Sequence, residues 1–239
     1  MSIRDWEGVA LVIGTGGIGE SISNYLTSAA PNLDVLVCGR KLKNQKGIYL
    51  DLENDDSFCS FEKELSLLKK PLRLVFNTSG FLHSNLLKPE KRLSHLNRSI
   101  LIKNFSINAF APILIAKSVE KYIRPELPFS FASLSARVGS IGDNRLGGWY
   151  SYRASKAAQN QFLKTLSIEW RRKLPLSIIS ILHPGTCDTE LSKPFQSGVP
   201  KDKLFTPLQS SEYLIQVLSK QKPYDSGKFL AWDSSVIPW

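Results

Sequence analysis

The stretch VALVIGTGGIG, residues 9–19, decides the fold of this chain. Its first five residues form a continuous apolar run, which is typical of a strand buried on both faces. Gly14, Gly16 and Gly19 then fit the pattern G-x-G-x-x-G, and Ile18 opens a stretch with apolar residues at helical spacing. A buried strand that turns through glycines into a helix is the first half of a β-α-β unit, so the stretch favours a parallel sheet.

The rest of the chain continues this alternation of strands and helices. Apolar runs predict six further strands, at residues 34–38, 48–52, 72–76, 129–134, 176–182 and 228–232. Apolar residues at helical spacing predict five helices, at residues 18–29, 58–69, 101–123, 149–173 and 210–219. Because the alternation runs over the whole length, residues 1–239 are predicted to form one α/β domain, a doubly wound parallel sheet of the Rossmann type flanked by helices.

Residues 186–207 stand apart from this alternation. They follow the sixth predicted strand and contain three prolines and Gly198, which favour irregular structure. Binding loops of α/β sheets follow the carboxyl ends of strands. We therefore expect residues 186–207 to form a lid, with Leu191, Phe195 and Val199 as its apolar cover.

Charge and composition exclude several classes of protein. The 31 Lys and Arg residues exceed the 21 Asp and Glu residues by 10, but no block reaches the five or six like charges of an interaction tail. We therefore expect no nucleic-acid partner. Three scattered cysteines favour neither a disulfide framework nor a metal site, and we expect no signal peptide and no membrane helix. These features predict a soluble cytoplasmic protein.

The glycine turn has the chemistry of a phosphate site. A tight turn and a close approach of backbone to a pyrophosphate both exclude a Cβ atom, and the following helix offers free N–H groups and the positive end of its dipole. In the first β-α-β unit of a chain, this pattern predicts a bound dinucleotide. The predicted contacts are Gly14, Thr15, Gly16, Gly17, Ile18 and Gly19.

The end of the second strand indicates which dinucleotide binds. An NAD site usually places a carboxylate there for the ribose hydroxyls, whereas this chain offers Arg40 and Lys41, with Lys43 close behind. A guanidinium suits a 2′-phosphate because its fork bonds two oxygens at once. We therefore predict NADP(H) rather than NAD(H). Asp51 and the neighbouring backbone at Leu52 are predicted to bond the adenine.

Tyr152 and Lys156 are the candidate catalytic pair. They lie four residues apart in a predicted helix and so share one face of it. A phenol has a pKa near 10 and is a poor acid–base catalyst at neutral pH. A neighbouring ammonium and the positive charge of a nicotinamide favour the phenolate, so we expect Lys156 and the cofactor to lower the pKa of Tyr152.

Taken together, these motifs resemble the short-chain dehydrogenase/reductase family. The resemblance rests on GTGGIG at residues 14–19, NTSG at residues 77–80, Asn108, the Tyr152–Lys156 pair and HPGT at residues 183–186, in matching order. The stretch SARVGSIGDN before YSYRASKAA and the tail GKFLAWDSSVIPW further resemble the C-factor-like subgroup, related to sniffer-type carbonyl reductases. This resemblance covers the whole chain.

The resemblance implies a role for each matching residue. It implies that Tyr152 gives a proton to a carbonyl oxygen, that Lys156 bonds the nicotinamide ribose, and that Asn108 positions a water in a proton relay. The cofactor contacts that it implies beyond the glycine turn are Asn77, Thr78, Ser79, Gly80, Tyr152, Lys156, Pro184, Gly185, Thr186 and Thr189. His183 is expected to support the backbone rather than to act as an acid or base.

Two features depart from the family pattern. The glycine turn is one residue shorter than the family's TGxxxGxG. The substrate-orienting serine is expected three residues before Gly139, but Ala136 stands there, between Ser135 and Ser140. Ser135 is our first candidate for this role and Ser140 the second, although Ser135 can serve only if the strand end bulges or turns.

The sequence thus predicts an NADP(H)-dependent oxidoreductase that transfers hydride between nicotinamide and a small carbonyl or alcohol substrate. A cofactor-binding signalling or regulatory protein with little turnover is the alternative, favoured by Ala136 and the C-factor resemblance. We expect a homodimer or homotetramer, assembled through the apolar helices at residues 101–123 and 149–173. The substrate and the direction of the reaction stay open.

Overall fold

The computed structural model describes residues 3–42 and 46–239, and its centre is one parallel sheet of seven strands. The strands in chain order are β1 (Gly8–Ile13), β2 (Leu33–Gly39), β3 (Gly47–Tyr49), β4 (Leu72–Asn77), β5 (Phe129–Leu134), β6 (Ser177–His183) and β9 (Lys228–Ala231). Their order across the sheet is β3-β2-β1-β4-β5-β6-β9. The chain therefore moves outward from β1 on one side and from β4 on the other, which is the doubly wound arrangement predicted from the sequence.

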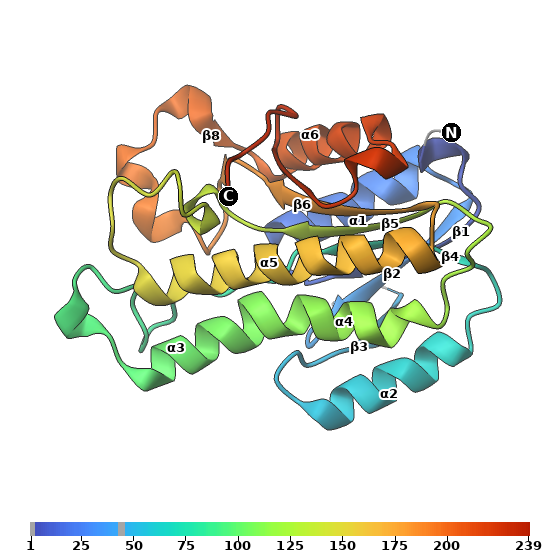
Figure 1. Cartoon of the computed structure of the whole chain (residues 1–239), viewed down its shortest axis with the longest axis horizontal. Coiled ribbons are helices and arrows are strands. Elements are labelled where there is room, and N and C mark those ends of the chain that lie inside the picture. The colour runs from blue at the N-terminus through green and yellow to red at the C-terminus, as the bar shows by residue number, and fades with distance from the viewer. Residues whose placement is uncertain (1–2, 43–45) are drawn as a thin grey trace.

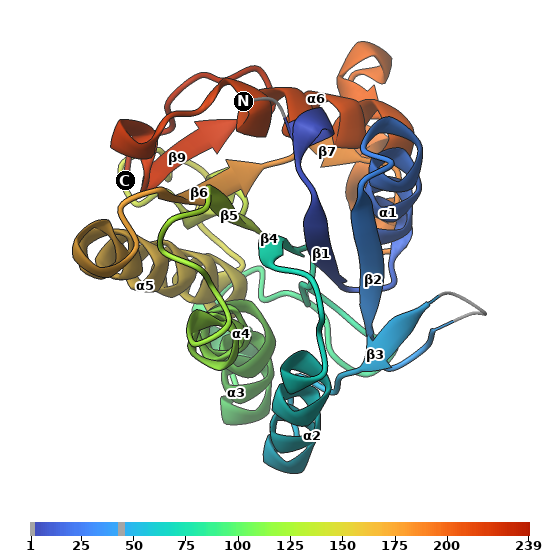
Figure 2. The same ribbon diagram turned by 90° about the vertical axis from the view of Figure 1, so that its right-hand side faces the viewer.

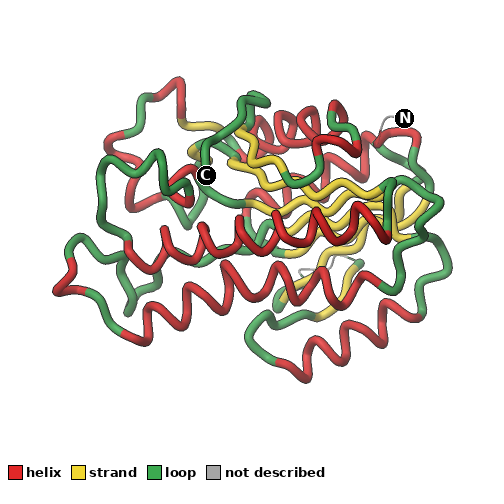
Figure 3. Tube along the Cα trace, viewed as in Figure 1, coloured by secondary structure: helices red, strands yellow, loops and turns green. Residues whose placement is uncertain are grey.

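Helices cover both faces of the sheet (Figures 1 and 2). They are α1 (Gly17–Ala29), α2 (Asp55–Ser66), α3 (Arg98–Asn104), the π-helical η3 (Phe105–Phe110), α4 (Ala111–Glu120), α5 (Tyr150–Lys173) and α6 (Pro207–Lys220). Figure 2 shows α1 and α6 on one face and α2 to α5 on the other. Short 3-10 turns and a small sheet of β7 (Thr186–Cys187) and β8 (Leu204–Phe205) complete the chain (Figure 3).

Each face of the sheet has its own apolar core. Alternate residues of β1 divide between the two cores: Leu11 and Ile13 pack toward α2, α4 and α5, whereas Ala10 and Val12 pack toward α1 and α6. This division follows from the alternation of side chains along a strand. Trp170 of α5 is almost fully buried and meets Phe129 and Phe131 edge to face.

The third strand is shorter than the sequence predicts. β3 ends at Tyr49 instead of Leu52, because the chain turns there into α2. The Asn54 side chain accepts hydrogen bonds from the N–H groups of Asp56 (2.9 Å) and Ser57 (3.4 Å). This cap starts α2 at Asp55, three residues before the predicted start.

The predicted helix at residues 101–123 is continuous but not regular. Pro112 has no N–H and cannot donate to the carbonyl of Asn108, four residues earlier. The Ala111 N–H donates to the Ser106 carbonyl, five residues back, which is the π-helical pattern. The Arg98–Glu120 stretch is also long and apolar enough to span a membrane by length and composition, contrary to our expectation. In this fold it packs between α2 and α5, as core helices of this composition do.

The expected assembly through the two long helices stays a prediction. Several residues on which it rests, among them Ile115, Leu163 and Trp170, lie in the core of the chain itself. Phe162 and Phe110 do expose 37% and 46% of their surface, which leaves apolar area on these helices for a partner.

Candidate active site

The glycine turn forms an open cradle at the carboxyl end of β1. Gly14 has φ +110°, and a Cβ atom there would lie 2.6 Å from Thr78 Oγ1; at Gly19 it would lie 2.2 Å from the Gly14 carbonyl. At Gly16 a Cβ atom would meet nothing within 4 Å. The turn is therefore closed toward the protein and open above the N-terminus of α1, where Gly16 provides no side-chain cap. This shape fits a pyrophosphate.

Basic side chains lie at the end of β2, beside this cradle. Arg40 and Lys41 are exposed, and Gly39 approaches Thr15 so closely that a Cβ atom there would lie 2.9 Å from Thr15 Cγ2. The glycine turn and the basic turn are thus adjacent, as a phosphorylated ribose requires. Lys43 lies outside the described residues.

Asp51 and Leu52 lie after β3, in the turn that leads to α2. The Asp51 N–H donates to Ser57 Oγ (2.7 Å), and the Asp51 carboxylate accepts a hydrogen bond from the Glu53 N–H (3.1 Å). Leu52 is half-buried against the core. The roles predicted for these two residues toward an adenine stay predictions.

The loop after β4 is tied to β1 and to β5. Thr78 donates from both N–H (2.8 Å) and Oγ1 (2.9 Å) to the Ile13 carbonyl. Asn77 Nδ2 donates to Ser133 Oγ (2.9 Å), while its Oδ1 accepts from the N–H (3.2 Å) and Oγ (2.6 Å) of Ser79. The predicted cofactor loop is therefore held rigidly beside the glycine turn.

Gly80, in the loop after β4, marks the place where three other predicted elements of the site meet that loop. A Cβ atom there would lie 3.8 Å from Asn108 Oδ1, 3.8 Å from Leu191 Cδ1 and 4.0 Å from Lys156 Nζ. The β4 loop, the π-helical segment, α5 and residues 186–207 thus converge at one point. From the sequence, this convergence is predicted by the family resemblance and not by the spacing of the residues alone.

Asn108 lies in the π-helical segment and is fully buried. Its Oδ1 accepts from the Phe81 N–H (2.7 Å), and its Nδ2 donates to the Phe81 carbonyl (2.8 Å) and to Ser155 Oγ (3.0 Å). The side chain is therefore engaged with the protein and fixes the β4 loop against α5. The water relay implied for Asn108 stays a prediction.

Tyr152 and Lys156 lie one turn apart on the buried face of α5, with Lys156 Nζ 5.9 Å from the centre of the Tyr152 ring. Burial raises the pKa of Tyr152 well above its usual value and lowers the pKa of Lys156 to about 7. The pKa of the phenol in the protein alone therefore lies above its usual value, and the lowering expected from Lys156 together with a nicotinamide stays a prediction. Burial disfavours the charged form of both groups and is the cause of both shifts.

Lys156 has two hydrogen-bond partners among the described residues. Its Nζ donates to the Leu134 carbonyl (2.8 Å) and to Gln159 Oε1 (2.9 Å). Gln159 was not among the site residues predicted from the sequence. The signal was present, since an amide three residues after Lys156 falls on the same buried face of the helix.

The strand end at Ser135 departs from the sequence prediction. Ser135 is buried, and its Oγ donates to Asn160 Oδ1 (2.6 Å). Ala136 keeps an extended backbone (φ −147°, ψ 148°), so the side chains of Ser135 and the half-buried Ala136 point to opposite sides. Ser140 is also buried, and its Oγ accepts from the Asp143 N–H (3.1 Å). This geometry goes against Ser135 as the substrate-orienting serine.

Residues 186–207 pack beside the glycine turn and the loop after β4. Gly185 has φ +76° and lies against Phe205, where a Cβ atom would come within 2.6 Å of the ring. The Pro184 carbonyl accepts a hydrogen bond from Ser210 Oγ (2.9 Å), and Thr186 pairs with Leu204 between β7 and β8. Thr189 lies against the glycine turn, 3.3 Å from the position that a Cβ atom of Gly17 would take.

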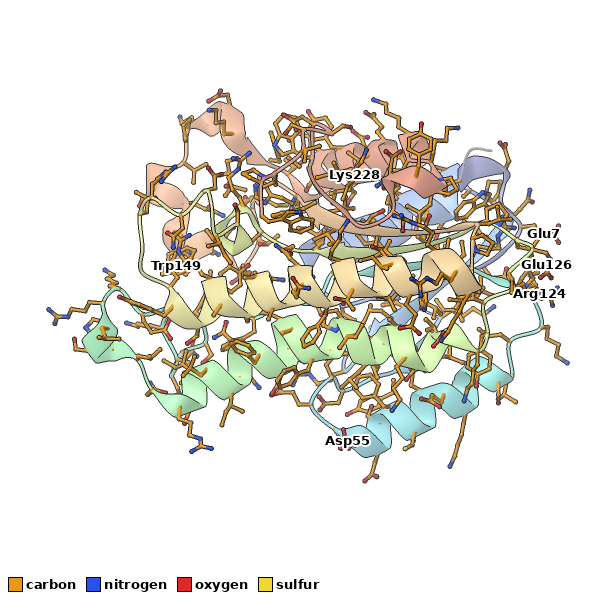
Figure 4. The ribbon with its side chains drawn as sticks, in the orientation of Figure 1. Glu7, Asp55, Arg124, Glu126, Trp149 and Lys228 are labelled. Carbon is orange, nitrogen blue, oxygen red and sulfur yellow. The ribbon has the colours of Figure 1, made fainter. Side chains whose placement is uncertain are left out.

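An aromatic cluster lies beside Tyr152. The Trp149 ring meets Tyr152 (6.1 Å between ring centres) and Phe195 (4.9 Å), and Phe195 meets His83 (5.6 Å). His83 Nε2 donates to the Leu191 carbonyl (3.1 Å), which ties residues 186–207 to the loop after β4. Trp149, labelled in Figure 4 at the start of α5, thus forms part of the wall around Tyr152.

Trp149 holds an unusual backbone conformation. Its φ of 51° lies in the left-handed region, which L side chains rarely adopt. The Trp149 N–H donates to the Glu90 carbonyl (2.5 Å), and the buried Glu90 carboxylate accepts from Ser151 N–H and Oγ at the start of α5. Glu90 therefore fixes both the residue before α5 and its first turn.

Comparison with known proteins agrees with this architecture. The short chain dehydrogenase family profile matches residues 8–199. The chain therefore belongs to the short-chain dehydrogenase family. It is 28% identical over 148 residues to C-signal of Myxococcus xanthus, an alignment that covers 62% of this chain and 83% of that protein.

Two solved structures have the same fold. The carbonyl reductase Sniffer of D. melanogaster superposes with a TM-score of 0.85 at 20% identity, covering 98% of this chain and 100% of that one. An NADPH-bound carbonyl reductase from chicken fatty liver superposes with a TM-score of 0.81 at 23% identity, covering 98% and 99%. The predicted Rossmann-type fold and the resemblance to C-factor and sniffer-type proteins are confirmed.

His183, at the end of β6, gives a test of stability that does not depend on activity. Burial, aided by the charge of Arg137, lowers its pKa from 6.5 to about 4. Between these pH values the unfolded chain binds the proton that the folded chain refuses, so stability falls as pH falls from 6.5 to 4, by at most about 3 kcal/mol. Denaturant unfolding against pH should show a flatter dependence for His183→Phe, and equal slopes would contradict this assignment.

Proposed function

We propose that this protein is an NADP(H)-dependent oxidoreductase that transfers hydride between nicotinamide and a small carbonyl or alcohol substrate. One observation carries the proposal. Tyr152 and Lys156 lie buried on one face of α5, and Asn108 contacts the same turn through Ser155. Gly80 lies near Lys156 and connects this pair to the carboxyl ends of the strands, where the glycine turn lies. A proton donor and a dinucleotide-binding turn at the carboxyl ends of the strands suit hydride transfer.

Each residue has a role that its surroundings support. The cofactor supplies the hydride, and residues 14–19 would hold its pyrophosphate. Burial raises the pKa of Tyr152, so the phenol is protonated at neutral pH. The positive charges of Lys156 and of a bound nicotinamide would have to lower that pKa for Tyr152 to donate its proton readily to a carbonyl oxygen. Lys156 has one N–H left after its bonds to Leu134 and Gln159, and this donor would bond the ribose.

The choice of NADP(H) rests on Arg40 and Lys41. Both are exposed beside the glycine turn, and a guanidinium suits a phosphate better than it suits ribose hydroxyls. The NADPH-bound state of the chicken carbonyl reductase is in keeping with this choice. On the substrate side, the rings of Trp149 and Phe195 favour an apolar carbonyl compound.

A second function is favoured by Ala136 and by the similarity to C-signal. Without a hydroxyl at position 136, the chain would bind cofactor and turn over slowly, as a signalling or regulatory protein does. Measuring NADPH oxidation with a panel of aldehydes, ketones and quinones separates the two functions. Turnover supports the oxidoreductase, whereas tight NADPH binding without turnover on any of them supports the regulatory protein.

The role of Tyr152 predicts the effect of removing its hydroxyl. Tyr152→Phe keeps the ring and its packing on Trp149 but removes the proton donor, so reduction should fall about 10²–10⁴-fold. NADPH binding, followed by nicotinamide fluorescence, should persist. Tyr150→Phe, an exposed position in the same turn, is the matched control. Near wild-type reduction by Tyr152→Phe would contradict the catalytic role.

The role of Arg40 predicts a change in cofactor choice. Arg40→Asp removes the guanidinium and places a carboxylate beside the 2′-phosphate. The preference for NADPH over NADH should fall at least about tenfold, since a charge-assisted hydrogen bond contributes roughly 1.5–3 kcal/mol. The dissociation constants of both cofactors check this, and equal binding of NADH and NADPH by the wild type would show the assignment to be wrong.

The strand end predicts that a hydroxyl at position 136 raises turnover. Ala136→Ser adds an oxyanion donor on the side opposite to Ser135, and kcat should rise about tenfold. Ser135→Ala should leave kcat nearly unchanged, because the Ser135 hydroxyl is engaged with Asn160. The reverse result, with Ser135→Ala inactive and Ala136→Ser without effect, would return the role to Ser135.

A further inference from the structure

Gln159 of α5 is a fully buried amide whose two halves are both hydrogen-bonded. Its Oε1 accepts from Lys156 Nζ (2.9 Å), and its Nε2 donates to Ser133 Oγ (2.9 Å) and to the Leu134 carbonyl (3.1 Å). A buried amide costs stability unless it is bonded in this way. An apolar side chain would fill the same place without that cost, so packing alone does not explain an amide at position 159.

The bonds of Gln159 continue into the cofactor loop. Ser133 Oγ, which accepts from Gln159, also accepts from Asn77 Nδ2 (2.9 Å), and Asn77 Oδ1 in turn accepts from Ser79. We call this series from Lys156 through Gln159, Ser133 and Asn77 to Ser79 the Gln159 chain. It joins Lys156 on α5 to the carboxyl ends of β4 and β5.

Lys156 depends on these neutral partners. It is 2% exposed, and burial is the cause that lowers its pKa to about 7. The titratable group that faces it is Tyr152 on its own helix. The neighbouring elements present the Leu134 carbonyl of β5, Gly139 packed on its Cβ, and Gly80 with Asn108, all of them neutral. Within the part of the chain that the structure describes, its charge is therefore supported by dipoles rather than by a carboxylate.

We propose that Gln159 is a positioning residue for Lys156. Its side-chain carbonyl, together with that of Leu134, holds two of the three N–H groups of the ammonium and leaves one for the ligand. The Gln159 chain fixes the amide so that its oxygen, not its nitrogen, faces Lys156. The role of Gln159 in catalysis rests on the proposed function, whereas its effect on the titration of Lys156 can be tested without turnover.

The test follows the charge of Lys156 directly. In protein labelled with ¹³C-lysine, the Cε signal of Lys156, assigned with Lys156→Arg, is titrated in the wild type and in three variants. Gln159→Met keeps the volume and removes the acceptor, Gln159→Glu keeps an acceptor and adds charge, and Gln161→Met is the control. Gln161 lies exposed on the same helix and bonds only locally, to Thr165.

The expected result is a displaced titration midpoint. Loss of one hydrogen bond to a charged group should lower the midpoint by about one to two pH units in Gln159→Met. Gln159→Glu should raise it above the wild-type value, and Gln161→Met should leave it unchanged. A folded Gln159→Met protein with an unchanged midpoint would overturn the proposal and leave Gln159 as structural packing.

Turnover then separates this inference from the proposed function. If carbonyl reduction is found, the upper limb of its pH profile should move with the Lys156 midpoint, to lower pH in Gln159→Met. A moving midpoint with a pH profile that stays in place would overturn the positioning role in catalysis. If no protein in the series turns over any carbonyl while the midpoint still moves, the proposed function fails and the hold of Gln159 on Lys156 stands.

Discussion

Two hydrogen bonds from Thr78 to the Ile13 carbonyl join the ends of β1 and β4, and the site depends on this junction. It lies where the strand order reverses, so the glycine turn after β1 and the loop after β4 face the same space. Gly14 and Gly19 fit only because neither carries a Cβ atom against Thr78 or against the other's backbone. From this fixed pair of loops, Asn77 reaches β5 and Gly80 reaches α5.

Burial sets the chemistry of the catalytic candidates. Because the surroundings of Tyr152 and Lys156 are largely neutral, the phenol holds its proton firmly and the lysine holds its proton weakly. In such a pair Tyr152 is the protonated donor, and the protonation of Lys156 depends on the charges and dipoles around it. The amide of Gln159 and the Leu134 carbonyl, rather than an acidic side chain, then decide how much positive charge the site retains.

The sequence predicted most of the fold because its signals are local. Buried strands such as β1, β4 and β5 are unbroken apolar runs, and α5 has apolar residues at helical spacing over its whole length. The end of β3 was predicted three residues too late because it depends on the cap at Asn54. The π-helical segment follows from the missing N–H of Pro112, a signal that apolar periodicity does not register.

The site was harder to predict than the fold. Tyr152, Lys156, Asn108 and the glycines were found through motif spacing and a family resemblance, but Gln159 matches no motif and is visible only through its contacts. The effect of burial on the pKa of Tyr152 was missed because burial is a property of the packed chain, not of the i, i+4 spacing. The direction of the Ser135 hydroxyl likewise depends on Asn160, 25 residues away.

The left-handed backbone at Trp149 places two opposing demands on one position. Glycine or asparagine would suit that backbone better by about 1–2 kcal/mol, yet neither carries the ring that stands against Tyr152 and Phe195. Other aromatic residues would keep a ring at the same backbone cost, whereas β-branched residues would lose on both counts. The set of residues tolerated at position 149 is therefore narrow. A smaller residue there would relieve the backbone strain and leave more space beside Tyr152. Position 149 is thus a natural starting point for altering the range of substrates.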